Sequence, residues 1–318
     1  MKLFPYFVQN SLDLEVFIIG YKNQGETILI VIEVDENPVF CILVDSYYHK
    51  DINIVEKILE EKKIKGIDII CWTHPHKDHS KGMKNIIEYY SDENTWIIIP
   101  EGIELSSHDF SKDAIELFEY LKKQVKQSTE KYKVMSISDY KDILFYYRSE
   151  PKFIYQAKEF LLKMSSFSPP SNCLRENLIL DQFDNNLNSI GFVLVLGNKY
   201  LVFTGDIENK AWNQLSRMFD NEIDVFKIPH HGSNTASEAL KLVSNIDISV
   251  CTSYRCGKSQ LPEQKILENY QNISSHVYLT QSLCNEENHK EYGIVKIKYD
   301  LLHETYDVKT YGNAREIK

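Results

Sequence analysis

Residues 66 to 79 read GIDIICWTHPHKDH, and this stretch points to both a fold class and a kind of chemistry. Its first eight residues are largely apolar and partly β-branched, which is typical of a buried strand. The next six contain His74, His76 and His79 together with the carboxylate of Asp78, although the whole chain has only 10 histidines. Imidazoles and carboxylates at this density, directly after a strand, predict a site for divalent metal ions.

A purely structural interpretation is also open, in which Asp78 caps a helix while the neighbouring histidines face solvent. More distant parts of the chain favour the metal site, because ligand-type side chains follow three further strand-like runs: Asp45, Asp206, and the pair His230 and His231. An aspartate after a strand is by itself a common turn former. Taken with residues 74–79, these positions predict that several strand ends meet at one centre.

Composition and charge are those of a folded protein. Hydrophobic residues make up 43% of the 318 residues and charged residues 26%, as in ordinary globular proteins. The formal net charge of -10 opposes non-specific attraction to phosphate backbones. A nucleic-acid substrate would therefore need a local basic patch or bound cations.

The sequence gives no indication of secretion or membrane insertion. Pro5, Gln9, Asn10 and Asp13 interrupt any apolar core of a signal peptide. No stretch approaches the roughly 20 apolar residues of a membrane span. The six cysteines are scattered and include no CxxC pair, so we expect buried thiols and a cytoplasmic protein.

Alternating strand and helix patterns predict a single layered α/β domain over residues 1–318. Strand patterns cover residues 15–19, 27–32, 39–44, 66–73, 96–99, 160–164, 191–196, 200–203, 224–228, 246–251, 277–280 and 294–297. Helical patterns cover residues 51–64, 82–90, 209–219, 234–243 and 262–271. Residues 101–158 break the alternation with polar helical patterns at 113–126 and 140–147. We expect them to form a helical insertion or lid that offers a surface to a protein partner.

The segment from His74 to His79 resembles the HxHxDH signature of the metallo-β-lactamase superfamily. Asp45, the Gly205-Asp206 pair and His230 follow the order of its other motifs. The chain more closely resembles the hydrolase domain of bacterial competence DNA-uptake channel proteins. The similarity runs from about residue 14 to 280 and is weakest over 101–158. It is carried by a QGD-like turn at 24–26, an N-S pair at 188–189, a TGD at 204–206 and a PHHGS at 229–233.

This resemblance implies an αββα four-layer sandwich that holds two divalent metal ions, zinc or manganese. His74 and His76 would bind the first ion. Asp78 and His79 would bind the second, and Asp206 would bridge the two.

The resemblance also implies roles for residues around the ligands. One of His230 and His231 would complete the second metal site while the other contacts a phosphate oxygen, and the sequence does not decide which. Asp45 would orient the ligand loop, because ligand imidazoles commonly need a hydrogen-bond partner. Substrate contacts are expected from three polar residues: Asn188, Ser189 and Ser233.

Two positions depart from the pattern. The superfamily supplies a further histidine to the first metal, but His108 is the only histidine between residues 80 and 205 and lies in the weakly matching region. Asn188 and Ser189 occupy the expected place, so water would complete the first site, which would leave an open position for catalysis. Leu261 stands where relatives often carry a histidine before a proline.

The expected function is hydrolysis of a phosphoester, in particular a phosphodiester of nucleic acid, by a metal-activated water. Asp78 or Asp206 would orient the attacking hydroxide, and His231 is a further candidate catalytic residue. Two alternatives are open: a phosphodiesterase for small molecules, which the acidic charge and aromatic content favour, and a non-catalytic metal-binding partner protein.

Overall fold

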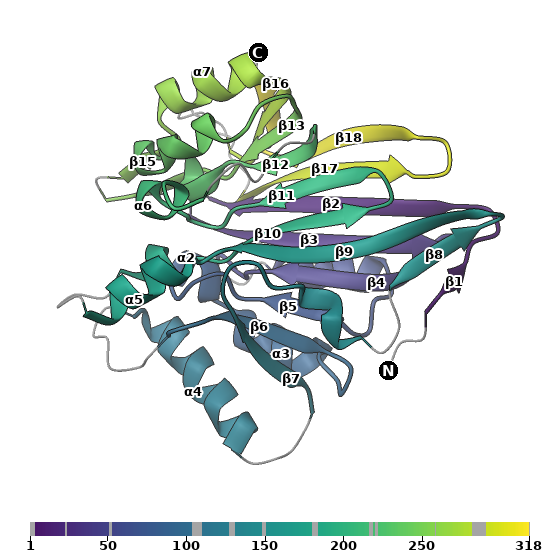
Figure 1. The fold of residues 1–318 in the computed structure, drawn as a ribbon, viewed down its shortest axis with the longest axis horizontal. Coiled ribbons are helices and arrows are strands. Elements are labelled where there is room, and N and C mark those ends of the chain that lie inside the picture. Colours follow the sequence, from purple (N-terminus) through teal and green to yellow (C-terminus); the bar gives the residue numbers. More distant parts are fainter. Residues whose placement is uncertain are drawn as a thin grey trace.

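Two β-sheets face each other in the computed structural model of the chain (Figure 1). The structure describes residues 4–317 except 23, 51–52, 104–109, 127–130, 148–150, 180–183, 216–218, 220–221, 258 and 282–290. Within these residues, the first sheet contains, in spatial order, β1 (Tyr6–Phe7), β8 (Lys152–Tyr155), β9 (Lys158–Ser168), β10 (Gly191–Leu196), β11 (Lys199–Phe203), β12 (Ile223–Lys227), β13 (Ile246–Cys251), β16 (Ser274–Leu279) and β19 (Arg315–Ile317).

The second sheet is formed by β18 (Thr305–Gly312), β17 (Tyr292–Asp300), β2 (Leu12–Tyr21), β3 (Gln24–Val34), β4 (Asn37–Val44), β5 (Ile69–Cys71), β6 (Trp96–Pro100) and β7 (Lys133–Ile137). Both sheets are mixed. The pairs β4–β5 and β5–β6 are parallel, as are β11–β12 and β12–β13. A short hairpin of β14 (Tyr254–Cys256) and β15 (Ser259–Leu261) forms a separate two-stranded sheet.

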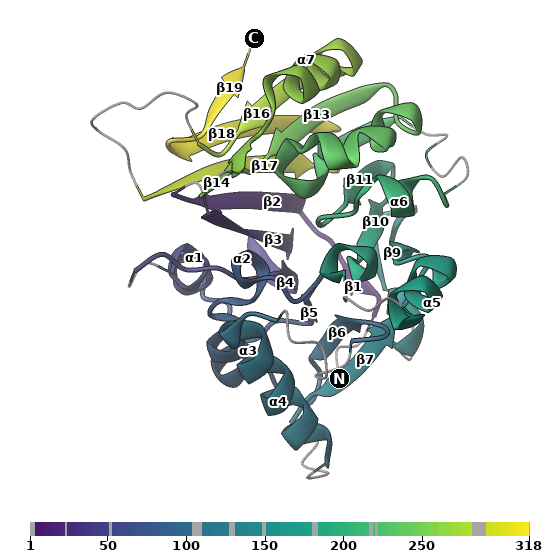
Figure 2. The ribbon, with the colours of Figure 1, turned by 90° about the vertical axis from the view of Figure 1, so that its left-hand side faces the viewer.

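Helices cover the outer faces of both sheets (Figure 2). The α-helices are α1 (Ile54–Glu61), α2 (Lys77–Ser80), α3 (Met83–Tyr90), α4 (Lys112–Lys126), α5 (Ser171–Ile179), α6 (Asn209–Trp212) and α7 (Gln264–Ile273). The 3₁₀ helices are η1 (Ile143–Tyr146), η2 (Asn185–Asn188), η3 (Pro229–Gly232) and η4 (Asn234–Lys241). No helix in the described part of the chain is long and apolar enough to cross a membrane.

The layers follow from residue alternation along the strands. In β2, Val16 and Ile18 point into a core between the two sheets, whereas Phe17 and Ile19 point into a second core shared with α1, α3 and α4. Successive side chains of a strand face opposite sides, so a strand that is apolar throughout can bury both faces. A third core packs α6, η4 and α7 on the other sheet. The predicted αββα four-layer sandwich is therefore confirmed.

The predicted helical insertion at 101–158 is only partly helical. It contributes α4 and the short helix η1, but also β7, which pairs with β6, and β8, which pairs with β9. These strands extend the two sheets at their margins. Their sequences mix polar and apolar residues because the strands are only half buried, and this weakened the pattern that would have predicted them.

Candidate metal centre

Four side chains from three segments of the chain converge at one end of the sandwich, and we call them the second half-site: Asp78, His79, Asp206 and His231. The Nε2 atom of His79 lies 3.5 Å from Oδ2 of Asp78 and 3.4 Å from Oδ2 of Asp206. The Nε2 atom of His231 lies 3.2 Å and 3.6 Å from the same two oxygens. Donor atoms that bind one ion at about 2.0–2.2 Å lie about 3.0–3.5 Å apart, so the observed separations suit a single divalent cation.

A neighbouring cluster, the first half-site, consists of His74, His76 and Asp206. The Nε2 atom of His74 lies 3.0 Å from Nδ1 of His76 and 3.7 Å from Oδ2 of Asp206. The same Asp206 oxygen thus faces both half-sites, which places it where a bridging carboxylate is needed. His108, the only histidine between residues 80 and 205, lies outside the described residues.

The backbone brings these groups together at strand ends. His74 follows β5 after two residues, Asp206 follows β11, and His231 follows β12. Asp45, His230 and His231 have positive φ angles of 55°, 44° and 52°. Left-handed backbone at non-glycine residues is costly and concentrates at functional sites, where it redirects the chain sharply. Here it turns each loop toward the centre at the point where its strand ends.

Asp45 lies behind the histidines and holds two of them. Its Oδ2 is 2.7 Å from Nδ1 of His79 and accepts a 2.6 Å hydrogen bond from the Thr73 hydroxyl group. The same hydroxyl oxygen is 3.0 Å from Nδ1 of His74. Because both rings meet their partners through Nδ1, both keep Nε2 directed at the half-sites. Asp45 thus lies where the sequence places an orienting residue, and its role remains a prediction.

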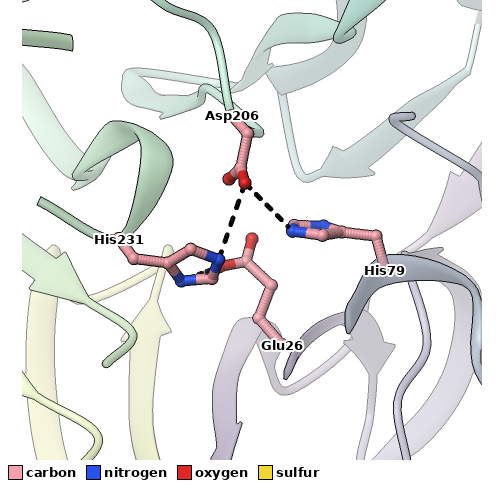
Figure 3. A group of neighbouring side chains, drawn as sticks. All are labelled: Glu26, His79, Asp206 and His231. Atoms are coloured by element: carbon pink, nitrogen blue, oxygen red, sulfur yellow. Dashed lines mark ion pairs between the residues drawn. The ribbon is translucent and has the colours of Figure 1, made fainter. Parts of the chain in front are cut away.

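His231 lies across the cluster from His79 (Figure 3), and it is held in a similar way. Its Nδ1 is 2.9 Å from the hydroxyl oxygen of Thr252 and 3.2 Å from the Thr252 carbonyl oxygen. The Thr252 hydroxyl donates a short hydrogen bond to Oε2 of Glu26. That oxygen also lies 2.8 Å from Nζ of Lys227, whose side chain is fully buried.

Electrostatics within the centre are dominated by carboxylates. Burial disfavours a charged His79, but Asp206, Asp45 and Asp78 outweigh it and raise the pKa of His79 well above its usual value. Burial acts against ionised Asp206 as well, yet His231 and His79 lower the pKa of Asp206 well below its usual value. A proton on His79 thus offsets part of the negative charge, a role that a divalent cation is suited to take over.

Two buried atoms of the centre lack hydrogen-bond partners. Among the described residues, neither Nε2 of His79 nor Oδ1 of Asp206 has one. Unpaired buried polar atoms are rare and call for an explanation such as an ion or water. Imidazole nitrogens and carboxylate oxygens are ligands that zinc accepts, so the residues fit the implied metal.

The two adjacent histidines have different surroundings. His231 is 1% exposed and directs Nε2 into the second half-site, with Nδ1 fixed by Thr252. His230 lies at the edge of the centre, with Nδ1 3.0 Å from Oε1 of Glu208 and Nε2 4.0 Å from Oδ2 of Asp206. Burial opposes protonation of His230, but Asp206 and Glu208 raise its pKa. This geometry favours His231 over His230 as the candidate ligand, and the roles of both residues remain predictions.

The three predicted substrate contacts all have partners within the protein. Asn188 donates a 2.6 Å hydrogen bond to the carbonyl oxygen of Glu101, and the Ser189 hydroxyl accepts a 2.9 Å hydrogen bond from the backbone N–H of Asp206. The Ser233 hydroxyl accepts from the backbone N–H of Thr235, as a helix cap does. Their roles in substrate binding remain predictions.

A cleft of about 410 Å³ opens directly onto the centre. Its walls combine candidate ligands and other side chains: His76, Lys77, Asp78, Phe110, Ser111, Asp206, His230, His231 and Tyr254. The Tyr254 ring stacks on His231 with 5.3 Å between ring centroids. Leu261, at the position where relatives often have histidine, does not line the described cleft.

Glu26 and Lys227 were missed as components of the centre. Glu26, His79, Asp206 and His231 offer ligand-type atoms within 4.8 Å of one another. The sequence gives no clear signal for either residue, because β3 also contains Glu33 and β12 also contains Asp224, so neither is the only charged residue of its strand. Both side chains are buried in the structure, where buried charges are normally paired.

No protein-family model and no curated protein matches this chain. Among solved structures it is similar to a "Putative metal-dependent hydrolase" from Parabacteroides distasonis, with 16% identity, a TM-score of 0.40, and coverage of 82% of this chain and 96% of that one. It is also similar to Zn(2+)-bound PqqB from Methylobacterium extorquens, with 9% identity, a TM-score of 0.41, and coverage of 78% and 84%. Because both TM-scores are low, the four-layer architecture is assigned from the two sheets and three cores of the chain itself.

Proposed function

We propose that this chain is a metal-dependent hydrolase of phosphoesters, with phosphodiesters as its principal substrates. The second half-site is the main support: four buried or half-buried donors, two imidazoles and two carboxylates, are spaced to share one divalent cation. The first half-site provides a place for a second ion, with Asp206 common to both. Zinc and manganese are the metals that suit this donor set.

Divalent cations held here would lower the pKa of water and stabilise charge on phosphoryl oxygens. The protein's own groups would do the rest. Asp78 or Asp206 would accept a hydrogen bond from the attacking water and orient it. Lys77 and His230 line the cleft, and both would donate hydrogen bonds to phosphate oxygens.

The size of the cleft favours a small phosphodiester or a short part of a nucleic acid over a long buried polymer. A volume of about 410 Å³ lies within the range of about 300–1,000 Å³ for sites that enclose small ligands. The net charge of -10 also offers little general attraction for polyanions. A small-molecule phosphodiesterase is therefore the second candidate function.

The test uses the purified full chain, with bound metal measured by mass spectrometry and turnover assayed with zinc and with manganese. Substrates are a bis-aryl phosphate, small phosphodiesters, RNA, and single- and double-stranded DNA. Two ions per wild-type chain, with metal and activity lost together in His76→Ala, would support the proposal. One tightly held ion without turnover of any substrate would instead indicate a metal-binding partner protein.

A further inference from the structure

We propose that Glu26 is a positioning residue for His231, that it acts through the hydroxyl group of Thr252, and that it does not itself bind metal. The inference rests on the proposed metal-dependent function. It assigns a role to a buried carboxylate that lies among the candidate ligands.

The donors and acceptors in the hydrogen bonds that link Glu26, Thr252 and His231 follow from the chemistry of the three side chains. The Thr252 hydroxyl donates its proton to Glu26, so its oxygen is left to accept from the N–H at Nδ1 of His231, 2.9 Å away. Nδ1 therefore carries the proton of the neutral ring. The lone pair on Nε2 would then be available to a cation shared with Asp78 and Asp206, whose Oδ2 atoms lie 3.2 Å and 3.6 Å from Nε2.

Two features argue against Glu26 as a ligand. Its Oε2 already lies 2.8 Å from Nζ of Lys227 and accepts the Thr252 hydroxyl proton. That oxygen also approaches His231 from the Nδ1 edge of the ring, at 3.5 Å, whereas the ligand oxygens of Asp78 and Asp206 lie near Nε2. A carboxylate behind the ring and neutralised by a buried ammonium group suits a supporting role.

The same arrangement occurs a second time in the centre. His74, the Thr73 hydroxyl and Asp45 form an imidazole–threonine–carboxylate sequence with contacts of 3.0 Å and 2.6 Å. In both cases the threonine follows a strand end, at β5 and at β13. Two unconnected segments therefore fix a candidate ligand in the same way. Carboxylate partners of this kind are general supports of metal-bound histidines.

The experiment measures zinc affinity of metal-free protein by competition with a chromophoric chelator. Thr252→Val removes the hydroxyl and leaves the ion pair of Glu26 with Lys227 intact. Loss of such a partner typically weakens metal binding about 10- to 100-fold, and we expect the lower end because the Thr252 carbonyl still contacts Nδ1. Imidazole ¹⁵N spectra of the metal-free protein should show the His231 tautomer disturbed, which a purely structural role of Thr252 would not cause.

The carboxylate of Glu26 is tested with the same zinc-affinity assay, in single and double variants. Glu26→Gln should weaken affinity, and adding it to Thr252→Val should cause little further loss, because both changes interrupt one path. Since Glu26→Gln leaves Lys227 buried without its partner, Glu26→Gln with Lys227→Met provides a version without an unpaired buried charge. Glu208→Gln is the matched control: Glu208 contacts His230, not His231, so zinc affinity should stay within about 3-fold, as expected for independent sites.

Different failures have different meanings. Loss of one whole ion in Glu26→Gln, with unchanged affinity in Thr252→Val, would show that Glu26 is a ligand and overturn the inference. Additive effects of the two substitutions would also overturn it. A wild-type chain that binds no metal would instead refute the proposed function itself.

Discussion

Two buried carboxylates, Asp45 and Glu26, stand behind the candidate ligands, and they differ in what neutralises them. Asp45 contacts His79 directly and His74 through Thr73; burial raises the pKa of Asp45, and the charge of His79 opposes that effect. Glu26 reaches His231 only through Thr252 and has its own cation, Lys227. The charge of Asp45 therefore acts on the candidate ligand histidines, whereas that of Glu26 is offset by Lys227.

Asp45 therefore acts on the candidate ligands through its charge, whereas Glu26 acts by holding the His231 ring in position. Asp45 helps to raise the pKa of His79, whereas Lys227 helps to lower the pKa of Glu26 despite burial. Asp45 should thus matter more for metal affinity. The pair of Glu26 and Lys227 should matter more for the stability of the fold. Four substitutions test this comparison, from the largest expected effect to the smallest.

Asp206→Asn removes the group that both half-sites share. We expect turnover to fall about 10³-fold or more, because the contribution of metal ions to transition-state stabilisation is several kcal/mol. Metal content and steady-state rates provide the measurement. Retention of two ions and of most activity would show that the two half-sites do not depend on this carboxylate.

Lys227→Met leaves the carboxylate of Glu26 buried without its cation. Breaking one partner of a buried pair costs about 3–5 kcal/mol, so the free energy of unfolding should fall by that amount in urea denaturation. The double variant with Glu26→Gln should recover most of it. A single variant as stable as wild type would mean that Glu26 does not depend on Lys227.

Asp45→Asn keeps a side chain of the same shape and tolerates the positive φ angle at this position. It removes the charge that His79 and His74 share, so we expect zinc affinity to fall about 10- to 100-fold. Competition titration of both ions is the measurement. A smaller loss than in Thr252→Val would reverse the proposed ranking of the two carboxylates.

Thr73→Val interrupts the path from Asp45 to His74 and leaves the direct contact with His79 in place. Only the metal affinity of the first half-site should fall, by about 10-fold, which is the lower end of the range for loss of a hydrogen-bond partner. Titrating the two ions separately with cobalt as a spectroscopic probe would show this. Equal weakening of both ions would contradict the separation of the half-sites.

Most of the fold was predictable because its core strands are apolar on both faces. The strand-like runs at 27–32, 191–196 and 246–251 all lie within observed strands, since continuous burial leaves a strong pattern in the sequence. The marginal strands β7, β8 and β18 were missed, because partly or largely exposed strands mix polar and apolar residues. Helix α5 was also missed, because its sequence carries little of the apolar periodicity that marks an amphipathic helix.

The candidate site was predictable in its residue types and only partly in its connections. Residues 74–79 contain enough histidine and aspartate to predict metal binding from the sequence alone. The positions of Asp45, Asp206 and His231 after strand-like runs predict that these side chains meet. Glu26 and Thr252 carry no such local signal. Their importance arises from a contact across 226 residues of sequence.

The sequence by itself determined the layered α/β fold and a cluster of histidines and aspartates suited to metal, because apolar periodicity and ligand chemistry are local properties of the chain. Only the tertiary structure decided that His231, rather than His230, faces the second half-site, and that Lys227 neutralises Glu26 behind it. Adjacent histidines have the same chemistry. They are distinguished by backbone turns and by buried hydrogen bonds to distant residues, which exist only once the strands have packed.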